Sequence, residues 1–223
     1  ATWALVDAGF GPTVDLVAVH GRGADDVWVG GVDRGSSGTT LRHWDGTAWR
    51  DAGYVGNVVD IWEHSPTDVW VTGGAAPHWT GAAWTTPTIS PSLSFVTADE
   101  LGSIAGNDSD GTAIFSGVVG LAFRAVVRWD GTSIGAGWSA SLAADFLRNG
   151  SMTFDGSYLV AYASTGSSPS ASLPPPLEGS LFRATAPPGE LLRVATSPGS
   201  TPTGDEHVYA LVPLGSDDDV LVL

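Results

Sequence analysis

The 223-residue sequence contains no cysteine and no lysine, so all nine of its basic residues are arginines. The lack of cysteine excludes disulfides, thiolate ligation of zinc and thiol catalysis. Charged residues make up only 15% of the chain, yet 24 Asp and Glu leave a formal net charge of −15. This negative surplus repels polyanions at long range, which argues against DNA, RNA and anionic membrane surfaces as partners.

Long apolar runs are also missing. No stretch approaches the roughly 20 apolar residues that a membrane-spanning helix needs, so no membrane insertion is expected. The chain begins at Ala1 without a basic and apolar signal pattern, and we expect either the mature form of an exported protein or a piece of a longer one. A composition rich in Ala, Gly, Val and Asp without Lys or Cys indicates an extracytoplasmic, bacterial protein.

An internal repeat is present. The segment Asp25–Gly31 (DDVWVGG) returns 42 residues later as Thr67–Gly73 (TDVWVTG). Each copy is followed by a second signature, HWDGTAW at His43–Trp49 and HWTGAAW at His78–Trp84. Fainter copies begin near Asp99, Asp155 and Asp205, so the mean spacing is about 45 residues. A period of this length with short alternating strands is typical of a β-propeller blade.

The repeat predicts an all-β fold, a single five-bladed β-propeller domain over residues 1–223. In the first unit the strands are expected at Val17–Val19, Val27–Gly30, Leu41–Trp44 and Ala48–Arg50. The blades are expected at approximately 15–53, 57–88, 92–141, 142–190 and 191–223 plus 1–10. Trp3 with Asp7–Gly9 resembles Trp49 with Asp51–Gly53, the last strand of the first unit. We therefore expect the N-terminal strand to join the last blade and close the ring, which would remove an exposed sheet edge.

These motifs resemble a known family. The pattern Asp-Val-Trp-x-x-Gly followed by His-Trp-Asp-Gly-Thr-x-Trp is similar to the tryptophan-rich β-propeller repeats of secreted proteins and lipoproteins of myxobacteria and related bacteria. The match is good over residues 15–84 and weak beyond residue 140. The resemblance implies export and a propeller, but no single activity. Five-bladed propellers include lectins and glycoside hydrolases, and that analogy of fold does not assign a function.

The first strand of each blade should line the central channel, and its side chains alternate between two faces. Val19 and Ile61 are expected to pack between blades. Asp60, Asp145 and Arg193 are expected to point into the channel, where they would form a polar ligand site, a carboxylate pair for glycoside hydrolysis, or an ion pair that satisfies itself. The last alternative is the preferred one.

Two aromatic or basic side chains complete the candidate ligand site. Trp62 has no tryptophan counterpart in the other units, whereas the other blades' tryptophans recur and should pack between blades. We therefore expect Trp62 to be exposed and to stack on a ligand. His20 occupies the equivalent position in the first unit. His43 and His78 are equivalent to one another and are expected to be structural.

One acidic loop resembles the start of a calcium loop. Asn107, Asp108 and Asp110 place oxygen ligands close together ahead of Gly111, but the distal Glu of an EF-hand is missing. A Ca²⁺ site is the less favoured interpretation, and a solvated turn built on Asx side chains is the favoured one.

Together these patterns lead to one functional hypothesis and two alternatives. The hypothesis is a non-catalytic recognition propeller that binds a glycan or a cell-surface protein through one loop face and the channel mouth. The alternatives are a hydrolase that uses Asp60 and Asp145, and a structural module of a larger surface protein. The sequence does not fix the ligand, the oligomeric state or a cofactor.

Overall fold

The computed structural model describes residues 7–35, 38–73, 76–90, 96–119 and 123–139, and beyond these the strands between Met152 and Val222. Every regular element in the described residues is a β-strand, as the sequence predicts. No described segment forms a helix long and apolar enough to cross a membrane. The chain divides into two compact units, Ala1–Thr86 and Pro87–Leu223, which we describe separately.

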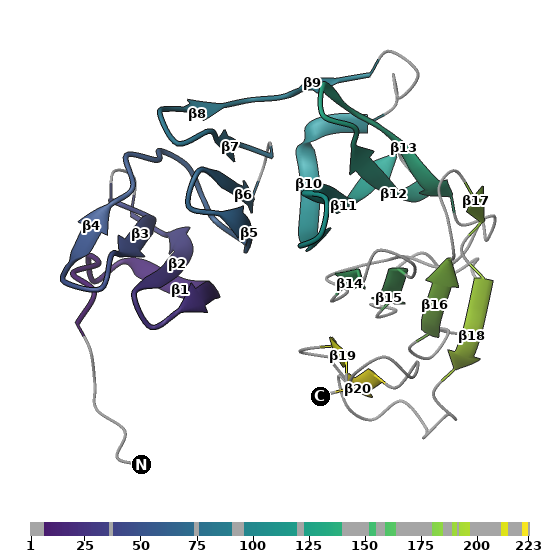
Figure 1. Cartoon of the computed structure of the whole chain (residues 1–223), viewed down its shortest axis with the longest axis horizontal. Coiled ribbons are helices and arrows are strands. Elements are labelled where there is room, and N and C mark those ends of the chain that lie inside the picture. The colour runs from purple at the N-terminus through teal and green to yellow at the C-terminus, as the bar shows by residue number, and fades with distance from the viewer. Residues whose placement is uncertain are drawn as a thin grey trace. The chain divides into compact units, whose positions relative to one another are not determined.

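The first unit holds two four-stranded antiparallel sheets (Figure 1). The first sheet has the order β1-β2-β3-β4. Its strands are β1 (Val14–Gly23), β2 (Asp26–Asp33), β3 (Leu41–Trp44) and β4 (Trp49–Asp51). The second sheet has the order β5-β6-β7-β8. Its strands are β5 (Asp60–Ser65), β6 (Asp68–Thr72), β7 (His78–Trp79) and β8 (Trp84–Thr85). The four strands predicted for the first repeat all lie on β1–β4, with shifts of one to a few residues at their ends.

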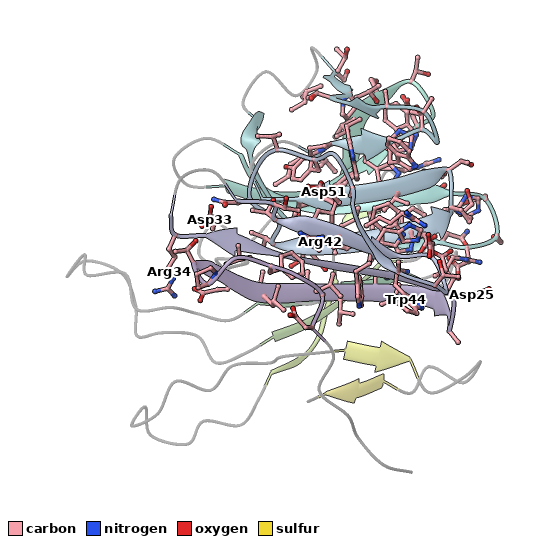
Figure 2. The ribbon with its side chains drawn as sticks, turned by 90° about the vertical axis from the view of Figure 1, so that its left-hand side faces the viewer. Asp25, Asp33, Arg34, Arg42, Trp44 and Asp51 are labelled. Carbon is pink, nitrogen blue, oxygen red and sulfur yellow. The ribbon has the colours of Figure 1, made fainter. Side chains whose placement is uncertain are left out.

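The sheets begin and end at turns that the sequence specifies. The turn between β3 and β4 is closed by Asp45, whose Oδ1 accepts hydrogen bonds from the Thr47 amide (2.9 Å), the Thr47 hydroxyl (2.6 Å) and the Ala48 amide (2.9 Å). The Thr47 hydroxyl and then the Arg50 guanidinium hold the pKa of Asp45 well below its usual range. Gly46 follows with a φ of 85°, a conformation that glycine adopts without strain. In Figure 2, Asp25 and Trp44 lie at one end of the first sheet and Asp33 and Arg34 at the other.

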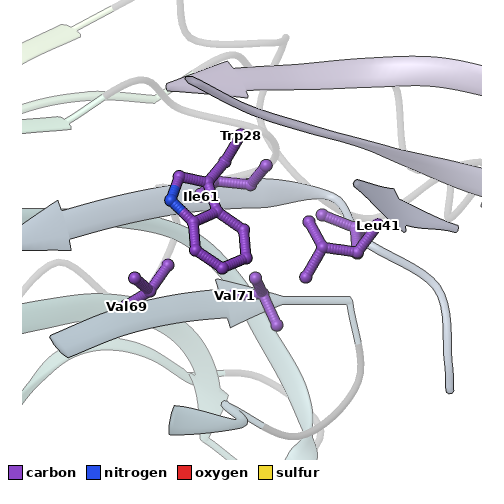
Figure 3. Close-up of a cluster of buried hydrophobic side chains, with 6 residues drawn as sticks. Trp28, Leu41, Ile61, Val69 and Val71 are labelled. Carbon is purple, nitrogen blue, oxygen red and sulfur yellow. The ribbon is translucent and has the colours of Figure 1, made fainter. Parts of the chain in front are cut away.

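The two sheets of the first unit pack against each other through one apolar cluster (Figure 3). Its buried members are Trp28, Leu41, Val58, Ile61, Val69 and Val71. Gly30 allows the close approach, because a Cβ at this position would lie 2.8 Å from the Val58 Cβ. The backbone also joins the sheets, since the Val58 amide donates to the Gly31 carbonyl at 2.9 Å. The Trp84 indole adds a second link by donating to the Ala52 carbonyl at 2.9 Å.

The described strands of the second unit form three sheets. The largest has the path β10-β11-β12-β13-β17, and β9 also pairs with β13. Its strands are β9 (Thr88–Ile89), β10 (Val96–Asn107), β11 (Thr112–Val119), β12 (Phe123–Trp129), β13 (Ser133–Ser139) and β17 (Gly189–Glu190). Another sheet has the order β14-β15-β16-β18, with strands β14 (Met152–Phe154), β15 (Leu159–Ala163), β16 (Ser180–Ala184) and β18 (Leu192–Thr196). The last pairs β19 (Leu211–Pro213) with β20 (Val220–Val222).

The third repeat is aligned differently from the sequence-based expectation. We expected the segment from Asp99 to Gly106 to match the Asp25 strand, but this segment lies within β10, the first strand of its sheet. The matching strand is β11, because Ile114 pairs with Arg128 as Trp28 pairs with His43. The expectation was wrong because Ile114 replaces the tryptophan that identifies this strand in the first two units.

Closure of a ring is not shown by these sheets. The N-terminal strand that was expected to close it includes Trp3, which lies outside the described residues. Val19, expected to pack between blades like Ile61, is 71% exposed, whereas Ile61 is 4% exposed. The predictions of a single domain and of five blades therefore stay predictions.

Candidate functional site

The first two sheets share a unit of one aspartate, one tryptophan and one histidine. In the first sheet Trp28 on β2 pairs in register with His43 on β3, and the two rings stack with their centroids 4.2 Å apart. The His43 Nε2 lies 2.7 Å from the Asp26 Oδ1 at the start of β2. Trp28 is buried, and Asp26 and His43 are half-buried. His43 thus contacts two side chains of its own sheet, as is expected of a histidine with a structural role.

The second sheet repeats this unit and adds a histidine. The rings of Trp70 and His78 stack at 3.9 Å, and the His78 Nε2 lies 2.7 Å from the Asp68 Oδ1. The Trp70 indole donates to the same oxygen at 3.0 Å, and the His64 Nδ1 lies 3.2 Å from the Asp68 Oδ2. Burial alone would raise the pKa of Asp68, but the hydrogen bonds and charges of His78 and then His64 outweigh burial and lower it.

The two Asp-Trp-His groups differ at the contact between β5 of the second sheet and the first sheet. The Glu63 side chain on β5 has an exposed fraction of 0%, and neither of its carboxyl oxygens has a hydrogen-bond partner of normal geometry. The Trp28 indole nitrogen, which corresponds to the paired nitrogen of Trp70, is likewise buried without such a partner. Two acceptor oxygens and a donor thus lie together at the contact between the sheets, next to the Asp26 carboxyl.

The surroundings of Glu63 favour its protonated form. Burial, followed by the neighbouring Asp26 carboxyl, raises the pKa of Glu63 from its ordinary value of 4.5 to about 8. The Arg22 guanidinium and the Trp28 indole oppose this increase. Arg22 also holds the strand itself, since its Nη1 donates to the Glu63 backbone carbonyl at 3.3 Å. Two carboxyls in contact can share one proton, which gives one of them the donor that both otherwise lack.

Among the three repeats whose strands are compared at this position, the second alone has a carboxyl, that of Glu63. Glu63 pairs with Val69 across the sheet, and the corresponding pairs are Gly21 with Val27 and Gly106 with Ala113. Two of the three matching sheets thus have glycine where the second has a carboxyl. Sequence analysis missed this residue, although the 42-residue offset already aligns Glu63 with Gly21.

The predicted ligand residues of the first unit are placed as follows. The Asp60 side chain is half-buried at the start of β5, and its Oδ1 accepts a hydrogen bond from the Ile61 amide at 2.9 Å. Trp62 is 6% exposed and stacks on His64 with the centroids 6.0 Å apart. The expected exposure of Trp62 is therefore wrong, because Trp62 packs in the interior like the recurring tryptophans. His20 is half-buried and pairs with Trp28 across the sheet.

The predicted residues of the second unit are only partly described. Asp145 lies outside the described residues, and for Arg193 only the backbone is described, as part of β18. Whether Asp60, Asp145 and Arg193 converge stays a prediction.

The loop compared with a calcium site is the turn between β10 and β11. The Asn107 Oδ1 accepts hydrogen bonds from the Ser109 amide (3.0 Å) and hydroxyl (2.9 Å), and the Asp110 Oδ1 accepts one from the Thr112 amide (2.9 Å). Asp108 is exposed. The side chains of Asn107 and Asp110 therefore build the Asx turn that was the favoured interpretation. Among the described residues, no group of three or more His, Asp or Glu is arranged to hold a metal ion.

The chemistry available at the described site is that of one buried carboxyl, Glu63, beside the half-buried carboxyl of Asp26. Catalysis needs contact with a substrate, and an exposed fraction of 0% for Glu63 leaves its carboxyl without that contact in this structure. Comparison with protein-family models finds no matching family, and comparison with curated proteins finds no significant match.

Proposed function

We propose that the chain is a five-bladed propeller that acts outside the cytoplasm as a non-catalytic recognition module and binds a cell-surface protein. The observation that carries this proposal is the repeated use of polar side chains for structure. In both sheets of the first unit the aspartate, tryptophan and histidine of the repeat bind one another. The repeated residues thus build a scaffold, and recognition is left to the loops.

Ring closure is supported by a mismatch between equivalent positions. Val58 and Ile61 before and on β5 are 0% and 4% exposed, because the first sheet covers them. Their counterparts Leu16 and Val19 on β1 are 54% and 71% exposed. In a closed propeller every blade has a neighbour on this side. We propose that the last blade, completed by the N-terminal strand, covers β1.

A protein partner is favoured over a glycan by the distribution of aromatic side chains. Sugar recognition commonly uses an exposed aromatic ring, and Trp62, the candidate for this role, is buried. The large hydrophobic residues exposed in the described parts of the chain are all aliphatic: Leu16, Val17, Val19, Val55 and Val59. A hydrolase based on Asp60 and Asp145 stays the alternative function, since Asp145 lies outside the described residues.

Binding to whole bacterial cells tests this function. The labelled chain should bind saturably to envelope-exposed surfaces, and we expect protease treatment of the cells to abolish binding while periodate oxidation of their glycans leaves it intact. The double variant Asp60→Asn, Asp145→Asn should bind like the wild type. Binding lost only after periodate would replace the protein partner by a glycan. Turnover of nitrophenyl glycosides that disappears in the double variant would contradict a non-catalytic role.

A further inference from the structure

The proposed function assigns no role to the carboxyl of Glu63. Among the residues whose side chains are described, Glu63 is the only carboxyl that is buried. It lies on the face of β5 that packs against the first sheet, as do Ile61 on the same strand and Val69 on β6. Its two oxygens have no normal hydrogen-bond partner. A buried acceptor left in this way lowers stability, and lowers it further when it is charged.

The fold does not require an acid at this position. The matching positions are Gly21 in the first sheet and Gly106 in the third, so a blade of this type forms without any side chain there. A side chain that costs stability and that the repeat does not need is a candidate for a specific role.

We propose that Glu63 and Asp26 form a proton-dependent latch between the first and second sheets. In the closed form the protonated Glu63 carboxyl donates a hydrogen bond to the Asp26 carboxylate, and the pair carries one negative charge. In the loosened form this proton has left to solvent, and two carboxylates repel each other across the contact between the sheets.

The groups that face Glu63 come from the three neighbouring strands. Asp26 on β2 is the acceptor, and it is held in place by His43 on β3 at 2.7 Å. Arg22 on β1 supplies the positive charge that partly offsets the loosened form. From β6 the side chain opposite Glu63 is Val69, which is fully buried and offers no polar partner. When both are ionised, Glu63 and Asp26 carry two negative charges, and Arg22 supplies only one positive charge.

The direction of the pH effect follows from the raised pKa. The folded chain keeps the Glu63 proton up to about pH 8, whereas the unfolded chain loses it near the ordinary pKa of 4.5. Between these two values the folded state binds more protons, so stability decreases as the pH rises. Below pH 4.5 the contribution of Glu63 is complete, and above pH 8 it is lost.

The test compares melting temperatures of the wild type, Glu63→Gln and Asp25→Asn between pH 5 and pH 9. The glutamine amide can donate an N–H hydrogen bond to the Asp26 carboxylate at every pH, and it cannot ionise. We expect the wild-type Tm to fall by about 5–10 °C over this range and that of Glu63→Gln to fall by less than half as much. Asp25→Asn is the matched control, because it makes the same change from carboxyl to amide at the exposed neighbour of Asp26. It should keep the wild-type slope.

Two measurements locate the effect. With ¹³C label at the side-chain carboxyls of its five glutamates, the wild-type chain should show one resonance that titrates near pH 8 and that Glu63→Gln lacks. At pH 9 the Val58 amide, which bonds the Gly31 carbonyl across the two sheets, should exchange with solvent faster in the wild type than in Glu63→Gln. A Glu63 resonance that titrates near pH 4.5, or equal pH slopes in wild type and Glu63→Gln, would overturn the latch.

Discussion

At the scale of single residues, glycine sets the distance between the two sheets of the first unit. Gly30 on β2 faces Val58 and Ile61, and a Cβ there would lie within 3.3 Å of the Ile61 Cδ1 as well as 2.8 Å from the Val58 Cβ. Both neighbours are buried. The position therefore requires the absence of a side chain, although its backbone conformation is that of an ordinary strand.

Gly30→Ala should lower the free energy of unfolding by about 1–3 kcal/mol, because the added methyl overpacks the contact. Urea denaturation of the wild type and the variant measures this loss. The matched control is Gly135→Ala on β13, where no atom lies within 4 Å of an added Cβ. Adding Val58→Ala to Gly30→Ala should restore part of the loss. Equal effects of the two glycine substitutions would show that the close approach at Gly30 does not affect the free energy of unfolding.

At the scale of elements, the hairpins β3–β4, β7–β8 and β12–β13 share one backbone conformation at their glycine but differ in the residue before it. Their glycines have φ values of 85° at Gly46, 84° at Gly81 and 92° at Gly131. The residue before the glycine is Asp45 or Asp130 in two sheets, and each aspartate accepts hydrogen bonds from the following amides. In the second sheet Thr80 occupies this place, and its hydroxyl instead donates to the Ala83 carbonyl at 3.2 Å.

Exchange of these two residues should have opposite effects on stability. Thr80→Asp should raise the free energy of unfolding by about 0.5–1 kcal/mol, because the carboxylate gains amide donors in a turn already formed. Asp45→Thr should lower it, because the turn loses the carboxylate oxygen that accepts the Thr47 and Ala48 hydrogen bonds. Thermal unfolding of both variants provides the comparison. A gain from Asp45→Thr would mean that the aspartate turn is not what stabilises the hairpin.

At this scale the sequence predicted the strands that carry a recurring tryptophan, and it failed where that signal was missing or misleading. The strands around Trp28 and Trp70 could be placed from the sequence, because tryptophan in an alternating pattern identifies a buried strand. The third sheet was aligned wrongly, since Ile114 and Arg128 carry no such signal. The burial of Trp62 was missed, because a side chain without a counterpart in other repeats looks like a surface feature. Glu63 was missed because its partner Asp26 lies in another sheet, and local spacing does not reveal such a contact.

At the scale of the whole molecule, ring closure makes a prediction about β1. If the last blade covers this strand, Val19→Asp places a charge in a buried contact and should lower the free energy of unfolding by about 2 kcal/mol or more. Val55→Asp is the control, because Val55 is 96% exposed in a loop. Thermal melts of both variants in the full chain test closure. Equal melting temperatures for the two would contradict a covered β1, as would cooperative melting of a chain that lacks residues 1–10.

The order of the strands along the chain also affects how the protein folds during synthesis. Leu16, Val17 and Val19 on β1 are synthesised before the last blade that we propose covers them, and each is more than half exposed in the folded first unit. A nascent chain that has completed only the first two sheets therefore exposes the aliphatic side chains of β1 until the later residues have been translated. Holdase chaperones that bind short aliphatic segments should associate with stalled chains of this length and dissociate from the finished product.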